Sequence, residues 1–190
     1  METATYIIWE EECLLSEKPS RFTTDIQNVL DNKIPDGFIS YANNWTEGYY
    51  GTQGIVVWKN NKRFVYKHST KEVIDRIVKL QHPSLPNIVW HDETDYIRDY
   101  IEGTAMNGYY QCMYPSTNWL KWYVIENYYI WKQTGGHGDF IPNNVIITPS
   151  MEIKWIDVNV GDSLETFLTM LPTHFNNKVT REEIEVLLGL

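Results

Sequence analysis

Residues 137–157 constrain the fold more than any other part of the chain. They begin with the polar loop HGDFIPNN, residues 137–144, and continue with two short apolar runs that flank a turn at 149–152. Apolar runs on either side of a four-residue turn predict a β-hairpin. Gly135 and Gly136 stand directly before the loop, where they are expected to end a helix. The segment therefore predicts a helix end, a polar loop and a hairpin, in that order.

Helical patterns surround this segment on both sides. Residues 116–132 carry aromatic and apolar side chains at i, i+3 and i+4 spacing, which is typical of a long amphipathic helix. Residues 163–190 are expected to form two helices interrupted at Pro172, because proline cannot continue a helix from its interior. The second half of the chain is thus predicted to be helical, with a single hairpin.

The first half is predicted to be rich in strands. Its only well-patterned helix covers 71–80, with Ser69 or Thr70 as the cap, and Asn60-Asn61 marks a tight turn between two strands. The predicted strands are 38–42, 55–58, 63–67, 87–91 and 95–100, with a further strand at 4–9 and a short helix at 23–30. This order of elements predicts an α+β fold with two lobes. We expect an N-lobe over 1–102, a C-lobe over 103–190 and a hinge near Glu102-Gly103.

Three polar residues around the hairpin form a set suited to phosphoryl transfer. Asn144 stands five positions after Asp139, and Asp157 stands eighteen positions after it. Phosphoryl transfer requires a carboxylate at the attacking hydroxyl and oxygen ligands for the Mg²⁺ that bridges the phosphates. Asp139 can supply the first group, and the side-chain oxygens of Asn144 and Asp157 can supply the others.

The same residues resemble the protein-kinase-like superfamily, in particular the HGDxxPxN variant of aminoglycoside and choline kinases. Both spacings agree with that family, as does the hairpin between Asn144 and Asp157. The resemblance implies that Asp139 and Asn144 belong to the catalytic loop and that Asn144 and Asp157 bind Mg²⁺. It implies ATP as the cofactor, and it gives His137 the role of bracing the loop.

The first half resembles the ATP-binding part of the same family. Gly51 and Gly54 match the latter part of the glycine-rich loop, whose backbone N–H groups approach phosphates. Lys67 ends the strand 63–67, as the family's ATP-binding lysine does. Where the family has a glutamate that holds this lysine, the resemblance points to Glu72, with Asp75 as the alternative one turn later. Glu102 falls in the segment that resembles the family's adenine-binding hinge.

The sequence departs from larger kinases after Asp157. The residues there are Asp-Val-Asn in place of Asp-Phe-Gly, no Ala-Pro-Glu segment follows, and 33 residues remain. We therefore expect a minimal kinase-like fold with a truncated helical C-lobe. One hypothesis is an ATP- and Mg²⁺-dependent phosphotransferase that acts on a hydroxyl of a protein or small molecule. The alternatives are a catalytically weak or inactive pseudokinase that serves as nucleotide sensor or protein-interaction scaffold, and an unrelated α+β domain.

The composition of the chain bears on which molecules it is expected to bind and on its expected location in the cell. A net charge of −9 argues against binding to nucleic acid or to an anionic membrane, which both require a basic face. Cys13 and Cys112 are far apart and predict two reduced thiols, and the chain start has no basic signal region, so a cytoplasmic location is expected. Eight tryptophans and 13 tyrosines exceed what one small core hides, which predicts a homodimer or a partner protein.

Overall fold

The computed structural model of the chain describes residues 34–45, 55–106 and 116–190. Several sequence predictions lie outside these residues: the strand at 4–9, the helix at 23–30, the two cysteines Cys13 and Cys112, and the two glycines Gly51 and Gly54.

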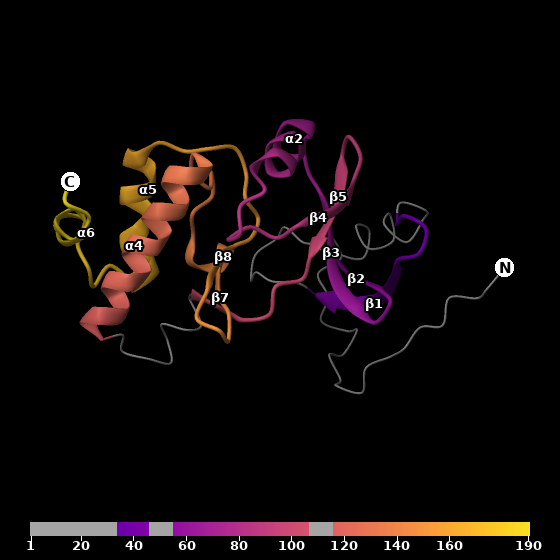
Figure 1. Ribbon diagram of the computed structural model, residues 1–190, viewed down its shortest axis with the longest axis horizontal. Helices are drawn as coiled ribbons and strands as arrows, with labels where there is room; N and C mark the ends of the chain where they lie inside the picture. Colours follow the sequence, from indigo (N-terminus) through magenta and orange to yellow (C-terminus); the bar gives the residue numbers. More distant parts are fainter. Residues whose placement is uncertain (1–33, 46–54, 107–115) are drawn as a thin grey trace.

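A five-stranded antiparallel sheet forms the first part of the described chain (Figure 1). Its strands lie in the order β1-β2-β3-β5-β4. Their bounds are β1 Ile39–Trp45, β2 Ile55–Lys59, β3 Lys62–His68, β4 Ile88–His91 and β5 Asp95–Asp99. Asn60 and Asn61 both have positive φ, 51° and 60°, so they form the tight turn that the sequence predicted between β2 and β3. The five strands agree in kind and order with the sequence prediction.

Helix α2, Lys71–Leu80, follows β3. Thr70 caps it, because its hydroxyl oxygen accepts a hydrogen bond of 3.4 Å from the backbone N–H of Val73. Val73 and Ile74 are buried, and the helix ends at Gln81 in a left-handed conformation. The cap therefore determines which residues of the first turn face inward and which face solvent.

A second, three-stranded antiparallel sheet has the order β6-β7-β8. It consists of β6 Thr104–Ala105, β7 Val145–Ile147 and β8 Ile153–Trp155, so the predicted hairpin is present and the short β6 is an addition to it. Gly103 leads into this sheet with φ +156°, and a Cβ on it would lie 2.5 Å from the carbonyl oxygen of Ile147. Only glycine allows the chain to pass so close to β7.

Helices cover the side of the second sheet that lies away from the first (Figure 1). They are α4 Thr117–Thr134, α5 Leu164–Met170 and α6 Arg181–Leu188, with 3₁₀ turns η2 Pro142–Asn144 and η3 Leu171–Phe175. The long aromatic helix and the two C-terminal helices are present as predicted, and Pro172 lies in η3 between the latter two. None of the helices in the described part of the chain is long and apolar enough to cross a membrane.

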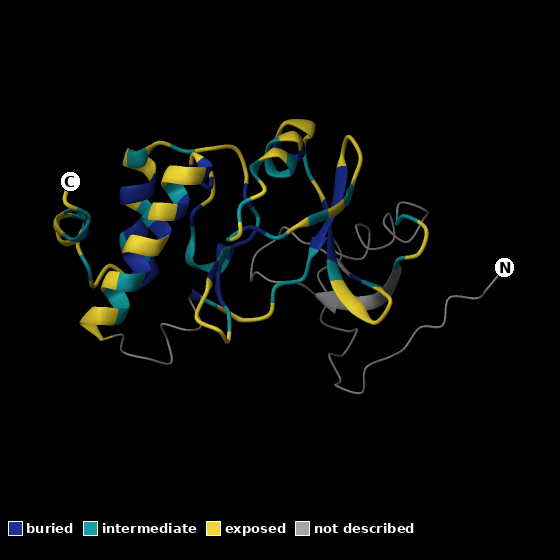
Figure 2. Ribbon diagram, in the orientation of Figure 1, coloured by how far each residue is buried: buried dark blue, intermediate teal, exposed yellow. Residues whose placement is uncertain are grey.

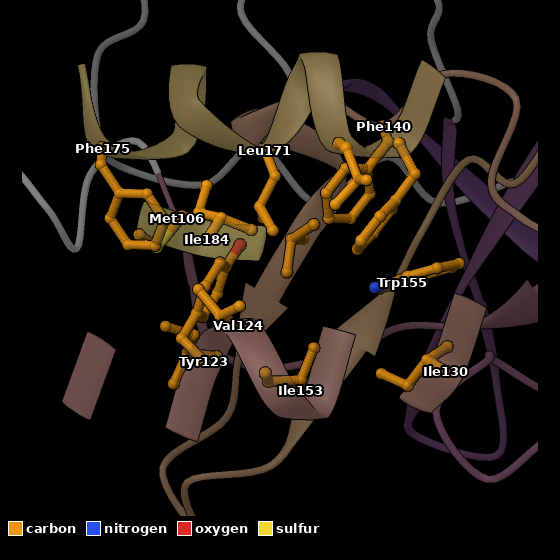
Figure 3. Close-up of a cluster of buried hydrophobic side chains, with 14 of the residues drawn as sticks. Met106, Tyr123, Val124, Ile130, Phe140, Ile153, Trp155, Leu171, Phe175 and Ile184 are labelled. Atoms are coloured by element: carbon orange, nitrogen blue, oxygen red, sulfur yellow. The ribbon is translucent and has the colours of Figure 1, made fainter. Parts of the chain in front are cut away.

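The two parts have separate hydrophobic clusters. The larger cluster fills the space between α4, α5, α6 and the hairpin, where Trp155, Tyr123 and Phe140 are at most 1% exposed (Figure 3). The smaller one, around Val57, Tyr66 and Ile97, covers one face of the first sheet. Buried residues accordingly gather on the inner sides of α4 and α5 and along β3 and β5 (Figure 2). The fold is thus α+β with two lobes, as the sequence predicted.

Candidate functional site

Lys67 on β3 and Asp157, two residues after the end of β8, meet between the two lobes. The ammonium group of Lys67 and the carboxylate Oδ1 of Asp157 form an ion pair, and the two side chains are only 9% and 14% exposed. Lys67 lies on a strand of the first sheet, and Asp157 follows a strand of the second sheet. The structure therefore brings together two members of the predicted residue set that are 90 positions apart along the chain.

Backbone hydrogen bonds hold Asp157 against the loop 137–144. The N–H of Ile156 donates to the carbonyl oxygen of Asn144 at 2.9 Å, and the N–H of Asn159 donates to that of His137 at 2.8 Å. Asp157 itself has a φ of 59°, which turns the chain sharply between these two bonds. The carboxylate leaves the hairpin from this turn and points to the first lobe.

Arg98 is a second cation beside Asp157. It lies on β5, is 2% exposed, and its guanidinium Nη2 is 3.5 Å from Asp157 Oδ1. Burial by itself raises the pKa of Asp157, but the charges of Lys67 and Arg98 outweigh this effect and leave the pKa below its usual value. Asp157 is therefore an ionised carboxylate held by two cations.

Sequence reasoning missed Arg98, although the strand pattern contained a signal for it. In the register of β3 and β5, Lys67 lies opposite Tyr96, and Val65 lies opposite Arg98. Residues two apart on a strand share a face, so Arg98 lies on the same face of the sheet as Lys67. A charged residue at a buried strand position is rare enough to indicate a specific partner.

Asp139 and Asn144 are joined within the polar loop. The amide Nδ2 of Asn144 donates to the carbonyl oxygen and to the carboxylate Oδ2 of Asp139, each at 3.0 Å. The 3₁₀ turn that begins at Pro142 folds the chain back so that these two residues, five positions apart, can meet. Asp139 is exposed and Asn144 is buried. The carboxylate of Asp139 therefore faces solvent, while the amide of Asn144 holds it from inside the loop.

His137 braces the loop from inside in its neutral form. It is 0% exposed, and its Nε2 donates to the carbonyl oxygen of Ile156 at 2.8 Å. Its Nδ1 accepts from the N–H of Asp139 at 3.2 Å, so both ring nitrogens are satisfied by one neutral tautomer. Burial lowers the pKa of His137, and the hydrogen bond to Ile156 opposes this only in part. The ring therefore connects Asp139 to the residue before Asp157.

A second buried histidine, His174 of η3, supports the same loop from the helical side. Its Nε2 donates to the carbonyl oxygen of Phe140 at 3.3 Å, and its Nδ1 accepts from the hydroxyl of Tyr123 at 2.6 Å. The rings of His174 and Phe140 also stack with centroids 4.4 Å apart. Burial lowers the pKa of His174 to about 3. No sequence pattern indicated this residue, because η3 lies far from the loop along the chain.

The structure does not place Glu72 or Asp75 beside Lys67. Both acids are exposed on α2 and face solvent, and no ion pair joins either of them to Lys67 in the part of the chain that the structure describes. The physical reason is the register of the helix, since Thr70 caps it so that Val73 and Ile74 turn inward. The described acidic partner of Lys67 is Asp157 instead.

Glu102 lies after β5, where the chain crosses to the second sheet. Its side chain is exposed and forms an ion pair with Arg63 of β3. Such surface pairs contribute little to stability. The carboxylate of Glu102 is turned to the surface between β5 and β6, and Gly51 and Gly54 lie outside the described residues.

The donor chemistry of the site is compatible with magnesium. Asn144 uses its amide nitrogen toward Asp139, which leaves its amide oxygen as an acceptor, and Asp157 is ionised. Mg²⁺ prefers oxygen ligands and commonly takes one or two from the protein and the rest from phosphate and water. Among the described residues, no group of three or more His, Cys, Asp and Glu side chains is arranged to hold a metal ion.

Comparisons with known proteins give a likeness in fold alone. No family model matches the chain, and no curated protein sequence matches it. Among solved structures, the chain is similar to the kinase domain of PknI from Mycobacterium tuberculosis, solved as a point mutant, with a TM-score of 0.49 and 14% sequence identity. The match covers 67% of this chain and 61% of that domain, so the chain spans less than two thirds of it.

Proposed function

We propose that this chain is a minimal kinase-like protein that binds ATP with Mg²⁺ between its two lobes and transfers a phosphoryl group to a hydroxyl of a protein or small molecule. The observation that carries the proposal is the meeting of Lys67 and Asp157 from two different sheets. Asp139 and Asn144 lie in the loop that is hydrogen-bonded to the same hairpin. Phosphoryl transfer depends mainly on positioning and electrostatic stabilisation, which such a set can supply.

Each residue has a role that follows from its chemistry. Bound ATP and Mg²⁺ supply the activated phosphoryl group. The amide oxygen of Asn144 and the carboxylate of Asp157 would hold the metal, and the ammonium of Lys67 would steady the phosphates. Asp139, exposed and oriented by Asn144, would accept a hydrogen bond from the attacking hydroxyl.

Incubation of the chain with labelled ATP and Mg²⁺ tests the proposal directly. We expect label on the chain itself or on an added hydroxyl acceptor, and we expect Asp139→Asn to abolish it. Asp36→Asn is the matched control, because Asp36 is exposed on the first lobe and belongs to no part of the site. Absence of label from the wild-type chain with any acceptor would exclude transfer.

A second candidate function is a nucleotide sensor or scaffold without catalysis. The observation that favours it is Arg98, which lies within 3.5 Å of the same carboxylate oxygen that pairs with Lys67. A permanent cation at this carboxylate can compete with a metal ion for it. Thermal stability measured with and without ATP and Mg²⁺ separates the two functions. Ligand at 100 times its Kd adds about 2.7 kcal/mol, so stabilisation without transfer would favour the sensor, and no stabilisation would favour a scaffold.

A further inference from the structure

Arg76 connects helix α2 of the first lobe to three backbone carbonyl groups of the second. Its guanidinium Nη2 donates to the carbonyl oxygen of Thr134 at 3.0 Å and to that of Gly136 at 2.5 Å. Its Nη1 donates to the carbonyl oxygen of Asn159. Arg76 thus makes three side-chain hydrogen bonds across the boundary between the lobes.

The three carbonyl groups belong to the two segments that carry the candidate site. Thr134 and Gly136 lie at the end of α4, directly before the loop that contains Asp139. Asn159 stands two residues after Asp157. The guanidinium therefore binds both the start of the loop that contains Asp139 and the segment that follows Asp157.

Charge favours this contact. The carbonyl oxygen of Thr134 is at the C-terminal end of α4, where the partial negative charge of the helix stabilises a cation. Burial lowers the pKa of Arg76, while the carboxylate of Asp162 opposes this, and a guanidinium stays charged at any physiological pH. Hydrogen bonds from a charged donor are roughly twice as strong as neutral ones.

The same junction is packed closely around Arg76. Asp162 accepts from the indole N–H of Trp131 at 2.9 Å and from the N–H of Gly138 at 3.1 Å. Its backbone N–H donates to the carbonyl oxygen of Gly135 at 3.2 Å. A Cβ placed on Gly161 would lie 3.6 Å from Arg76 Nη2. Both segments therefore meet at the guanidinium and at Asp162.

We propose that Arg76 is a positioning residue for Asn144 and Asp157, the two side chains proposed to hold Mg²⁺. It holds the loop of Asp139 and Asn144 in register with Asp157, whereas Lys67 is positioned by strand β3. This inference rests on the proposed nucleotide site and specifies how that site is organised. Loss of Arg76 is expected to weaken the part of nucleotide binding that requires Mg²⁺ and to spare the part that does not.

Calorimetric titration of the whole chain with ADP, once with EDTA and once with Mg²⁺, tests the inference. The variants are Arg76→Met and Arg76→Lys, and the control is Lys79→Met, which removes an exposed cation from the same helix. We expect Arg76→Met to lower the gain in affinity that Mg²⁺ produces by about tenfold or more, because it removes three charge-assisted hydrogen bonds and the loss of one alone would account for about tenfold. The affinity of Arg76→Met for ADP in EDTA is expected to stay within about twofold of the wild-type affinity. For Arg76→Lys, the gain in affinity with Mg²⁺ should lie between those of the wild type and Arg76→Met. For Lys79→Met, it should equal that of the wild type.

Two outcomes would overturn the inference while leaving the proposed function in place. One is an Mg²⁺ gain in Arg76→Met equal to that of the wild type. The other is an equal loss of affinity with and without metal, which would assign Arg76 a structural role only. Arg76→Lys supplies the same comparison if the methionine variant does not fold, as judged by circular dichroism. A wild-type chain that binds no ADP in either condition would remove the proposed nucleotide site and this inference together.

Discussion

Lys67, on the central strand of the first sheet, forms an ion pair with Asp157, which lies two residues after the last strand of the second sheet. This contact joins the lobes at the point where the candidate site lies. Both side chains are largely removed from water, and Arg98 lies 3.5 Å from the same carboxylate oxygen, so the ionised Asp157 is stabilised by both cations. The ion pair therefore stabilises the ligand-free chain, and the same two side chains are candidates for binding phosphate and metal.

Removal of either partner of this pair should destabilise the chain. We expect Lys67→Met to lower the free energy of unfolding by less than the about 3–5 kcal/mol of a fully broken buried ion pair, because Arg98 still lies 3.5 Å from Asp157 Oδ1. Asp157→Asn should cost more, about 3–5 kcal/mol, because it removes the carboxylate that both cations share. The double variant should lose less than the sum of the two. Urea denaturation of the four proteins measures this coupling, and strictly additive losses would show that the pair contributes nothing.

The contribution of Asp157 should depend on pH in a defined direction. Its pKa is lowered in the folded chain, so the stability it provides is present above the ordinary pKa of aspartate, about 3.9. This stability is lost as the pH falls through the lower pKa of the folded state. The difference in unfolding free energy between the wild type and Asp157→Asn should therefore shrink below about pH 4. A difference that stays constant down to about pH 3 would contradict this expectation.

His174 should make the chain less stable in mild acid. Its pKa in the folded chain is about 3, against about 6.5 in the unfolded chain, so between these values the unfolded state binds one more proton. Stability should then fall by up to about 1.4 kcal/mol per pH unit as the pH decreases through this window. Urea denaturation between about pH 7 and 5 should show a flatter profile for His174→Gln. His91→Gln, at an exposed position, should keep the wild-type slope.

Two glycines near the loop provide a matched test of backbone packing. Gly135 and Gly138 both have positive φ, +73° and +79°. A Cβ on Gly135 meets nothing within 4 Å, whereas one on Gly138 would lie 1.7 Å from the carbonyl oxygen of Val160. Gly135→Ala should therefore cost only the left-handed penalty of about 1–2 kcal/mol. Gly138→Ala should cost clearly more in urea denaturation, and equal losses would mean that the loop relaxes freely.

The local arrangement of the polar loop and the hairpin could be predicted from the sequence because they form one short supersecondary unit. Asp139, Asn144 and Asp157 are separated only by a 3₁₀ turn and a hairpin, whose geometry depends on local turn residues and strand length. The types of the described helices and strands were predictable for the same reason, since caps, glycines and apolar periodicity act over a few residues.

The partners of these residues could not be predicted in the same way. Lys67 was expected beside Glu72 or Asp75, yet the cap at Thr70 turns both acids outward, and Asp157 lies at the ammonium instead. Strand β6 consists of two residues and exists only because the edge of β7 is available for pairing. Its formation depends on a sheet that no local pattern describes.

The amino-acid sequence by itself determined the order of the elements and the polar set in the loop and hairpin, because these depend on interactions between near neighbours along the chain. The tertiary structure alone decided that Arg98 joins Asp157, that Arg76 bridges the lobes and that His174 supports Phe140. Each of these contacts joins distant segments, and its geometry depends on how two sheets and several helices pack against one another.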